Sequence, residues 1–118
     1  MAKPHASAYT VRLVPIDQVQ PYERNPRLND AAVDAVAASL REFGFRKPLV
    51  VDAKHVIICG HTCFKAAQQL GLKRVPVHVA RDLSRDQVRA YRIADNKTAE
   101  IAAWDQELLR IELDALQD

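Results

Sequence analysis

The residues that could do chemistry stand where an apolar run, residues 56–59, meets Gly60 and the polar sequence after it. The run is typical of a strand, and the residues after Gly60 are typical of a helix. Such a junction forms an anion site, because glycine lets the backbone approach a ligand and the first NH groups of a helix have no intrahelical acceptor. We predict a phosphate-binding turn made by Gly60, His61, Thr62, Cys63 and Lys65. A plain turn with a packing glycine is the alternative.

Two cysteines flank this turn and allow further chemistry. Cys59, His61 and Cys63 are metal-ligand types, but they straddle a strand end and a helix start, and a fourth ligand would have to come from His55, His78 or an acidic residue. We therefore predict no metal site. Cys63, in the first helical turn, should have a lowered thiol pKa because the helix dipole favours the thiolate. Cys59 ends an apolar strand and is expected to be a buried structural thiol.

Three arginines form a second group that could bind a ligand. Ser84 and Gln87 have the spacing of a capping box and open a helix. On that helix Arg85, Arg89 and Arg92 follow at spacings of four and three, so they should share one face. Such a face either grips DNA phosphates or is an ordinary solvated surface, and the pattern leaves both readings open.

The elements that position these residues predict one α/β domain. β-branched and apolar runs predict strands over residues 9–14, 49–51, 55–59 and 75–79. The second and third strands should form a hairpin, because only three residues connect them. Pro76 argues that the last strand lies at an edge of the sheet, or that the strand begins there.

Helical patterns fill most of the remaining sequence. One helix should run from Asn29 or Asp30 to residue 43, where Gly44 ends it, and another from Gly60 to residue 70, where Gly71 ends it. A single helical turn is expected within residues 15–20. In the helix that begins at residue 84, the core-facing residues should be Val88, Tyr91 and either Ile93 or Ala94. The last helix starts near Asp105 with an apolar stripe of Leu109, Leu113 and Leu116.

Composition and charge limit the classes of protein. The chain has 118 residues, 48% of them apolar, which suits one compact domain. No run reaches membrane length and residues 1–8 hold no signal-peptide core, so we expect a cytoplasmic protein with reduced thiols. Residues 1–99 hold 16 Lys or Arg against 9 Asp or Glu, a balance of +7, whereas the rest hold 1 against 6, a balance of −5. A basic body suits a polyanion such as nucleic acid.

The stretch GHTCFKAAQQLG, followed by VPVHV, resembles the nucleotide-site motif of the ParB/sulfiredoxin superfamily. Other segments match in the same order: Asn25-Pro26 before the first long helix, FGFRKPL at residues 43–49, and Ala94-Asp95-Asn96 at the family's Glu-Asn element. The resemblance covers residues 11–99 and is greatest to domains of phages and DNA methyltransferases. It implies an α/β (α+β) fold with a small mixed sheet of about four strands, flanking helices and a helical C-terminal part.

The resemblance also implies a division of the chain and a ligand. Residues 9–99 would form the ParB-like domain, and 100–118 an acidic amphipathic helix that packs on a partner or continues into a longer protein. The turn would bind a nucleoside triphosphate, CTP or ATP, with magnesium, and Lys47, Asn96 and Lys97 would join the site. Cys63 and Ala99 stand where the family carries arginines, so two bidentate phosphate ligands are missing. Lys65 and Lys97 can replace them only as point charges.

Three classes of function follow. The first is a DNA-associated ParB-like module that binds a nucleotide. The second is a nuclease, although Asp52 and Asp95 are the only evident carboxylates near the turn. The third is a small-molecule phosphotransferase, similar to the superfamily's free-serine kinase. Sulfiredoxin chemistry is not expected, because His61 stands where sulfiredoxin has its reactive cysteine. We expect DNA and a nucleotide as partners, no membrane, and either a homodimer or a fusion to a downstream domain.

Overall fold

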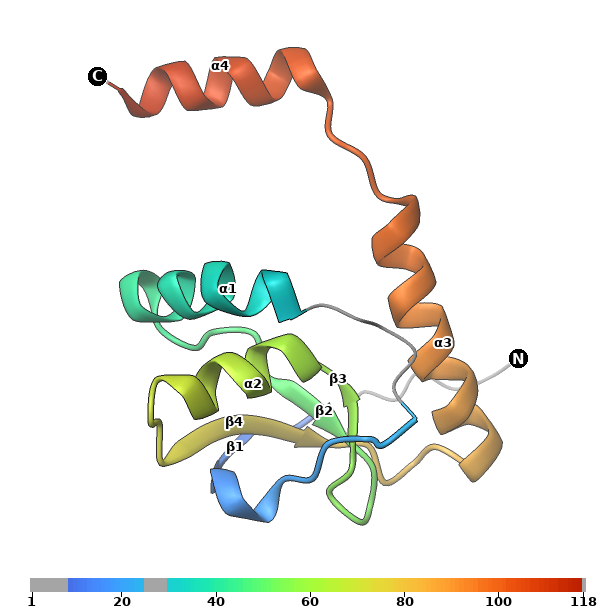
Figure 1. Cartoon of the computed structure of the whole chain (residues 1–118). Helices are drawn as coiled ribbons and strands as arrows, with labels where there is room; N and C mark the ends of the chain where they lie inside the picture. The colour runs from blue at the N-terminus through green and yellow to red at the C-terminus, as the bar shows by residue number, and fades with distance from the viewer. Residues whose placement is uncertain (1–8, 25–29, 118) are drawn as a thin grey trace.

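The computed structural model of the chain describes residues 9–24 and 30–117. It has four strands, four α-helices and one 3₁₀ helix among these residues (Figure 1). In chain order they are β1 (Arg12–Pro15), the 3₁₀ helix η2 (Ile16–Gln18), α1 (Asp30–Phe43), β2 (Leu49–Val51), β3 (Ile57–Cys59), α2 (His61–Gln69), β4 (Arg74–Val79), α3 (Arg85–Ile101) and α4 (Gln106–Leu116). Asn25, Pro26 and the alternative N-cap Asn29 lie outside the described residues.

The four strands form one mixed sheet in the order β1-β4-β2-β3. The β2–β3 hairpin and the β1–β4 pair are antiparallel, whereas β2 and β4 are parallel. The prediction of a small mixed sheet with flanking helices is therefore confirmed. The inference from Pro76 is wrong, since β4 lies inside the sheet and begins at Arg74. Pairing with β2 starts only at Val77, so at Pro76 the strand has β1 alone beside it and the missing NH group costs little.

Helices α1 and α2 cover one face of the sheet, with α2 between α1 and the strands (Figure 1). Phe64 and Ala67 of α2 pack against fully buried strand residues such as Leu49 and Ile57. Ala66, on the other side of α2, packs against α1, where its partners are Val33 and Ala37. Small residues on α2 let the two helices approach closely. This packing fixes the direction in which the N-terminus of α2 points.

Helix α3 packs beside β3 and begins with the predicted capping box. The Ser84 hydroxyl accepts from the Gln87 NH group, and the Gln87 side chain accepts from the Ser84 NH group. Val88 is buried, as predicted, but Tyr91 is half-exposed and Ile93 and Ala94 are exposed. The position one helical turn after Val88 is Arg92, and this arginine takes the inward place that we expected Ile93 or Ala94 to fill.

Helix α4 begins after Asp105, whose side chain accepts from the Leu108 NH group, so the predicted start is confirmed. An extended segment, residues 102–105, separates α4 from α3, and Figure 1 shows α4 away from the sheet. The predicted boundary after Ala99 falls inside α3. Large apolar side chains of α4 are exposed, among them Leu108, Leu113 and Leu116. Within the described part of the chain, no helix is both long and apolar enough to cross a membrane.

Candidate phosphate and nucleotide site

The turn between β3 and α2 has the geometry that the sequence predicts. Gly60 is the N-cap of α2 and has left-handed backbone angles, φ 104° and ψ 24°. A Cβ atom at this position would lie 2.6 Å from Cδ2 of Leu49, so both conformation and space require glycine. The Phe64 NH group donates to the Gly60 carbonyl over 2.9 Å and closes the first helical turn. The NH groups before Phe64 therefore point out of the helix end, where an anion could accept from them.

His61 is a neutral group at this turn. Its Nε2 accepts from the backbone NH group of Tyr22 over 3.1 Å, so the ring proton belongs on Nδ1. Burial lowers the pKa of His61 from an ordinary 6.5 to about 4, and the positive charges of Arg92 and Lys65 act in the same direction. Near neutral pH, His61 can therefore offer a ligand a hydrogen bond but not a positive charge.

Cys63 is half-buried and packs against the core beneath α2. Burial raises the pKa of its thiol, while the charge of Lys47 acts in the opposite direction. Our expectation of a lowered pKa is therefore wrong, because the cost of burying a thiolate is the largest effect on this group. The effect of Lys47 also shows that this lysine, from the segment before β2, lies near the start of α2. Lys65 adds a second ammonium group there, exposed on the helix surface.

Arg92 forms the most buried polar network beside the turn. Its Nε donates to the Ile57 carbonyl over 3.0 Å, and its Nη2 lies 3.6 Å from Oδ2 of Asp52. The guanidinium group also lies 3.8 Å from the centre of the Tyr22 ring. Nη2 is buried and has no hydrogen-bond partner among the described residues. Because Tyr22 also donates to His61, this network ties the segment before α1 to the start of α2.

The predicted arginine group is divided by this burial. Arg85 and Arg89 are exposed, as a phosphate-binding face would need, whereas only 7% of Arg92 is exposed. Arg92 therefore does not share an exposed face with Arg85 and Arg89, and contact of Arg85 and Arg89 with DNA stays a prediction. Periodicity places Arg92 on the same side as Val88, but because charged residues are rarely buried, the sequence pattern alone favours an exposed Arg92.

Asn96 and Lys97 make contacts inside α3. The Asn96 amide donates to the Arg92 carbonyl over 3.1 Å, and Nζ of Lys97 lies 3.5 Å from Oε2 of Glu100. These contacts leave the role of both residues in ligand binding a prediction. Thr62 is half-buried in the first turn of α2, and its role is a prediction of the same kind.

Cys59 belongs to a small polar cluster that the sequence reading missed. Burial raises the pKa of its thiol to about 11, although a hydrogen bond with the Tyr91 hydroxyl acts in the opposite direction. That same hydrogen bond, together with burial, raises the pKa of Tyr91 to about 12. Both groups are therefore neutral near pH 7. Among the described residues, no three His, Cys, Asp or Glu side chains are grouped so that they could hold a metal ion.

A four-stranded mixed sheet, two stacked helices on one face and a glycine turn between strand and helix define a ParB/sulfiredoxin type of domain. The sequence model of the ParB N-terminal domain family matches residues 2–97, and the chain belongs to this family. The nucleoid occlusion protein of Bacillus cereus (strain B4264) is 32% identical over 114 residues, 92% of this chain and 35% of that protein. The chain thus spans about a third of the length of such relatives.

A shorter relative is covered almost completely. The ParB-like nuclease domain-containing protein YnaK of Escherichia coli (strain K12) is 34% identical over 74 residues, which are 62% of this chain and 85% of YnaK.

Solved structures agree with the family. Caulobacter crescentus ParB complexed with CTP-gamma-S superposes with a TM-score of 0.69 and 29% identity, over 81% of this chain and 56% of that chain. The same ParB complexed to the centromeric parS site gives a TM-score of 0.58 and 29% identity, over 72% of this chain and 46% of that chain. Arabidopsis thaliana sulfiredoxin shares the fold alone, with 21% identity and a TM-score of 0.57 over 70% of this chain and 96% of that chain.

Proposed function

We propose that this chain is a DNA-associated ParB-like domain that binds a nucleotide at the β3–α2 turn. The observation that carries the proposal is the β3–α2 turn, where Gly60 adopts a left-handed backbone and packs closely on Leu49 while the first NH groups of α2 point out of the helix end. The complex of Caulobacter ParB with CTP-gamma-S supports a nucleoside triphosphate as the ligand. We expect the ligand to be the magnesium complex of CTP or ATP.

Backbone groups and side chains of this chain would bind the phosphates together. Backbone NH groups at the start of α2 would donate to phosphate oxygens, with the helix dipole behind them. Lys47 and Lys65 would supply positive charge from two sides of the turn, and His61 a neutral hydrogen bond. Because Cys63 packs against the core and cannot imitate an arginine fork, we expect weaker binding than an arginine-bearing site would give.

Isothermal titration with CTP, ATP and ADP, with and without magnesium, tests this proposal. We expect one of the triphosphates to bind with 1:1 stoichiometry. The double variant Lys47→Gln/Lys65→Gln should weaken that binding by about tenfold or more, because two charged contacts are lost. Lys54→Gln/Lys73→Gln removes two exposed lysines elsewhere and should bind like the parent. Binding by neither triphosphate, or equal binding by both double variants, would reject the site.

DNA association is the second part of the proposal. It is supported by family membership, by the structure of Caulobacter ParB on its parS site and by the basic balance of residues 1–99. We expect this domain to bind duplex DNA without strong sequence preference, since the sequence shows no helix-turn-helix pattern after Ala99. A link to phage or methyltransferase proteins, a homodimer and a downstream domain stay predictions.

Cleavage of DNA is the alternative that the name of YnaK favours. Incubation of supercoiled plasmid with the chain and magnesium or manganese separates the two readings. Nicked or linear products that disappear in an Asp52→Asn or Asp95→Asn variant would show that the chain is a nuclease and not only a binding module. Phosphotransfer to an amino acid would instead convert ATP or ADP in the presence of free serine, which a coupled nucleotide assay detects.

A further inference from the structure

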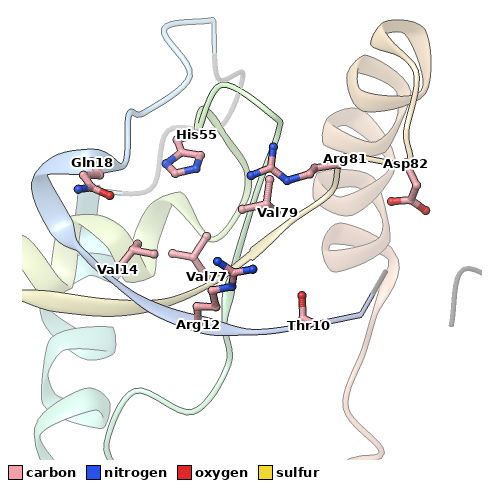
Figure 2. A pocket seen from close by; sticks show the side chains of 9 residues that line it. All are labelled: Thr10, Arg12, Val14, Gln18, His55, Val77, Val79, Arg81 and Asp82. Carbon is pink, nitrogen blue, oxygen red and sulfur yellow. The ribbon is translucent and has the colours of Figure 1, made fainter. Parts of the chain in front are cut away.

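A second cavity, of about 600 Å³, lies at the β1/β4 end of the sheet (Figure 2). It shares no residue with the proposed nucleotide site. Three valines, two arginines and a histidine are the important parts of its wall, namely Val14, Val77, Val79, Arg12, Arg81 and His55. They come from β1, from β4, from the β2–β3 hairpin and from the segment after β4, so only the folded chain brings them together.

The charged groups of this cavity are mostly positive. Figure 2 shows the guanidinium groups of Arg12 and Arg81 directed over Val77 and Val79, with His55 on the far side of the same space. Neither arginine forms an ion pair with any described residue. Asp82, also on the wall, turns its carboxylate away from the Arg81 guanidinium (Figure 2). Two arginines against one carboxylate leave the charged side chains of the wall with a positive balance.

Backbone contacts fix the places on the chain from which these three side chains extend. The antiparallel register sets Arg12 opposite Val77, and the Arg81 NH group donates to the Val79 carbonyl over 3.1 Å. His55 has a left-handed φ of 65°, the only positive φ of a non-glycine among the described residues. Its NH group donates to the Asp52 carbonyl and its carbonyl accepts from the Gln20 NH group, each over 2.9 Å. Such a conformation costs free energy and persists only when its surroundings impose it.

We propose that this cavity is a second anion site, which binds a phosphate group independently of the Gly60 turn. Two guanidinium forks can donate in pairs to phosphate oxygens, and an imidazole can add a further hydrogen bond. The valine floor is apolar and suits the sugar or base attached to the phosphate. The phosphate group is therefore that of a nucleotide, free or in a nucleic-acid backbone.

Solution NMR of the full chain with three probes tests the proposal: inorganic phosphate, CMP and a short DNA duplex. We expect at least one probe to shift the amide signals of Val77, Val79 and Arg81 saturably. Arg12→Gln/Arg81→Gln should weaken that binding by about tenfold or more. Arg41→Gln/Arg110→Gln removes two exposed arginines outside the cavity and should leave it unchanged. Saturation by CMP alone identifies a free nucleotide, and saturation by the duplex alone identifies DNA phosphates.

Two further variants keep this test independent of folding and of the proposed nucleotide site. His55→Asn retains a residue that tolerates left-handed angles and removes the imidazole, so it should fold and bind phosphate more weakly. Lys47→Gln/Lys65→Gln should bind at this cavity like the parent, whatever happens to triphosphate at the Gly60 turn. The proposal is overturned if no probe shifts these signals, or if Arg12→Gln/Arg81→Gln and the parent bind equally.

Discussion

His61 couples the β3–α2 turn to the segment before α1. Its ring accepts the Tyr22 NH group and therefore must stay neutral at Nε2 for that hydrogen bond to exist. Burial makes the neutral form the stable one in the folded protein, with a pKa of about 4. Protonation of His61 would both bury a charge and break the contact with Tyr22.

The first prediction concerns acid stability. Unfolded His61 takes up a proton near its ordinary pKa of 6.5, whereas folded His61 does so only near 4, so acid favours the unfolded state in this window. The free energy of unfolding should fall as the pH is lowered from about 6.5 to about 4. In His61→Gln, which keeps an acceptor but cannot titrate, the fall should be smaller. Urea unfolding at several pH values measures both, and equal slopes for the two proteins would refute the assignment.

The second prediction compares two arginines of α3. Arg92 is buried and contacts Ile57, Asp52 and Tyr22, so Arg92→Ala removes a charge-assisted network and leaves the Asp52 carboxylate short of a partner. We expect a loss of about 2–4 kcal/mol in the free energy of unfolding. Arg85→Ala, on the exposed surface of the same helix, should cost less than about 0.5 kcal/mol. Similar costs for both variants would show that the Arg92 network stabilises nothing.

Helices α2 and α4 differ strongly in how much of their apolar surface is buried. Helix α2 lies between α1 and the sheet, and its Ala66 and Ala67 are fully buried. Helix α4 is amphipathic as the sequence predicts, yet Leu108, Leu113 and Leu116 are exposed and only Leu109 is partly buried among its leucines. An apolar face that covers no core contributes little to the stability of the domain.

The third prediction tests this contrast with one substitution at two places. Leu49 is fully buried and Leu113 is 51% exposed. Leu49→Ala should lower the free energy of unfolding by about 2–5 kcal/mol, and Leu113→Ala by less than about 0.5 kcal/mol. Far-UV circular dichroism is the right probe, because the only tryptophan, Trp104, lies in the exposed segment before α4 and does not report on the core. A large loss for Leu113→Ala would mean that α4 is packed in solution.

The whole molecule is divided by charge. Residues 1–99, which include the sheet and both proposed anion sites, carry the positive balance, and the residues after them carry the negative one. Arg85, Arg89 and the cavity arginines lie on the exposed surface of the basic part. A polyanion should therefore meet the sheet and its helices and be repelled by α4.

The fourth prediction concerns the salt dependence of DNA binding. Affinity for duplex DNA should fall steeply with salt, because counterions released from phosphates drive association. Arg85→Ala/Arg89→Ala should flatten the plot of log affinity against log salt by up to about two phosphate contacts, and Arg92 should not count toward this slope. Fluorescence anisotropy over a range of salt concentrations measures it. If the double variant has the same slope as the parent, Arg85 and Arg89 do not contact DNA and are part of an ordinary solvated surface.

Local features of this protein could be predicted from sequence because their causes lie within a few residues. The glycine turn, the capping box at Ser84 and the start of α4 at Asp105 each depend on backbone angles and hydrogen bonds between near neighbours. The mixed sheet and its family also followed from short motifs in a fixed order. These features locate the proposed nucleotide turn.

Burial and long-range contacts were decided only by the tertiary structure. Arg92 turned inward because Tyr22, Asp52 and Ile57 meet it there. The pKa of Cys63 rose because the core beneath α2 excludes water. The cavity between Arg12, His55 and Arg81 joins residues from distant parts of the chain. Desolvation and the approach of distant charges depend on packing in three dimensions, which no local pattern in the sequence records.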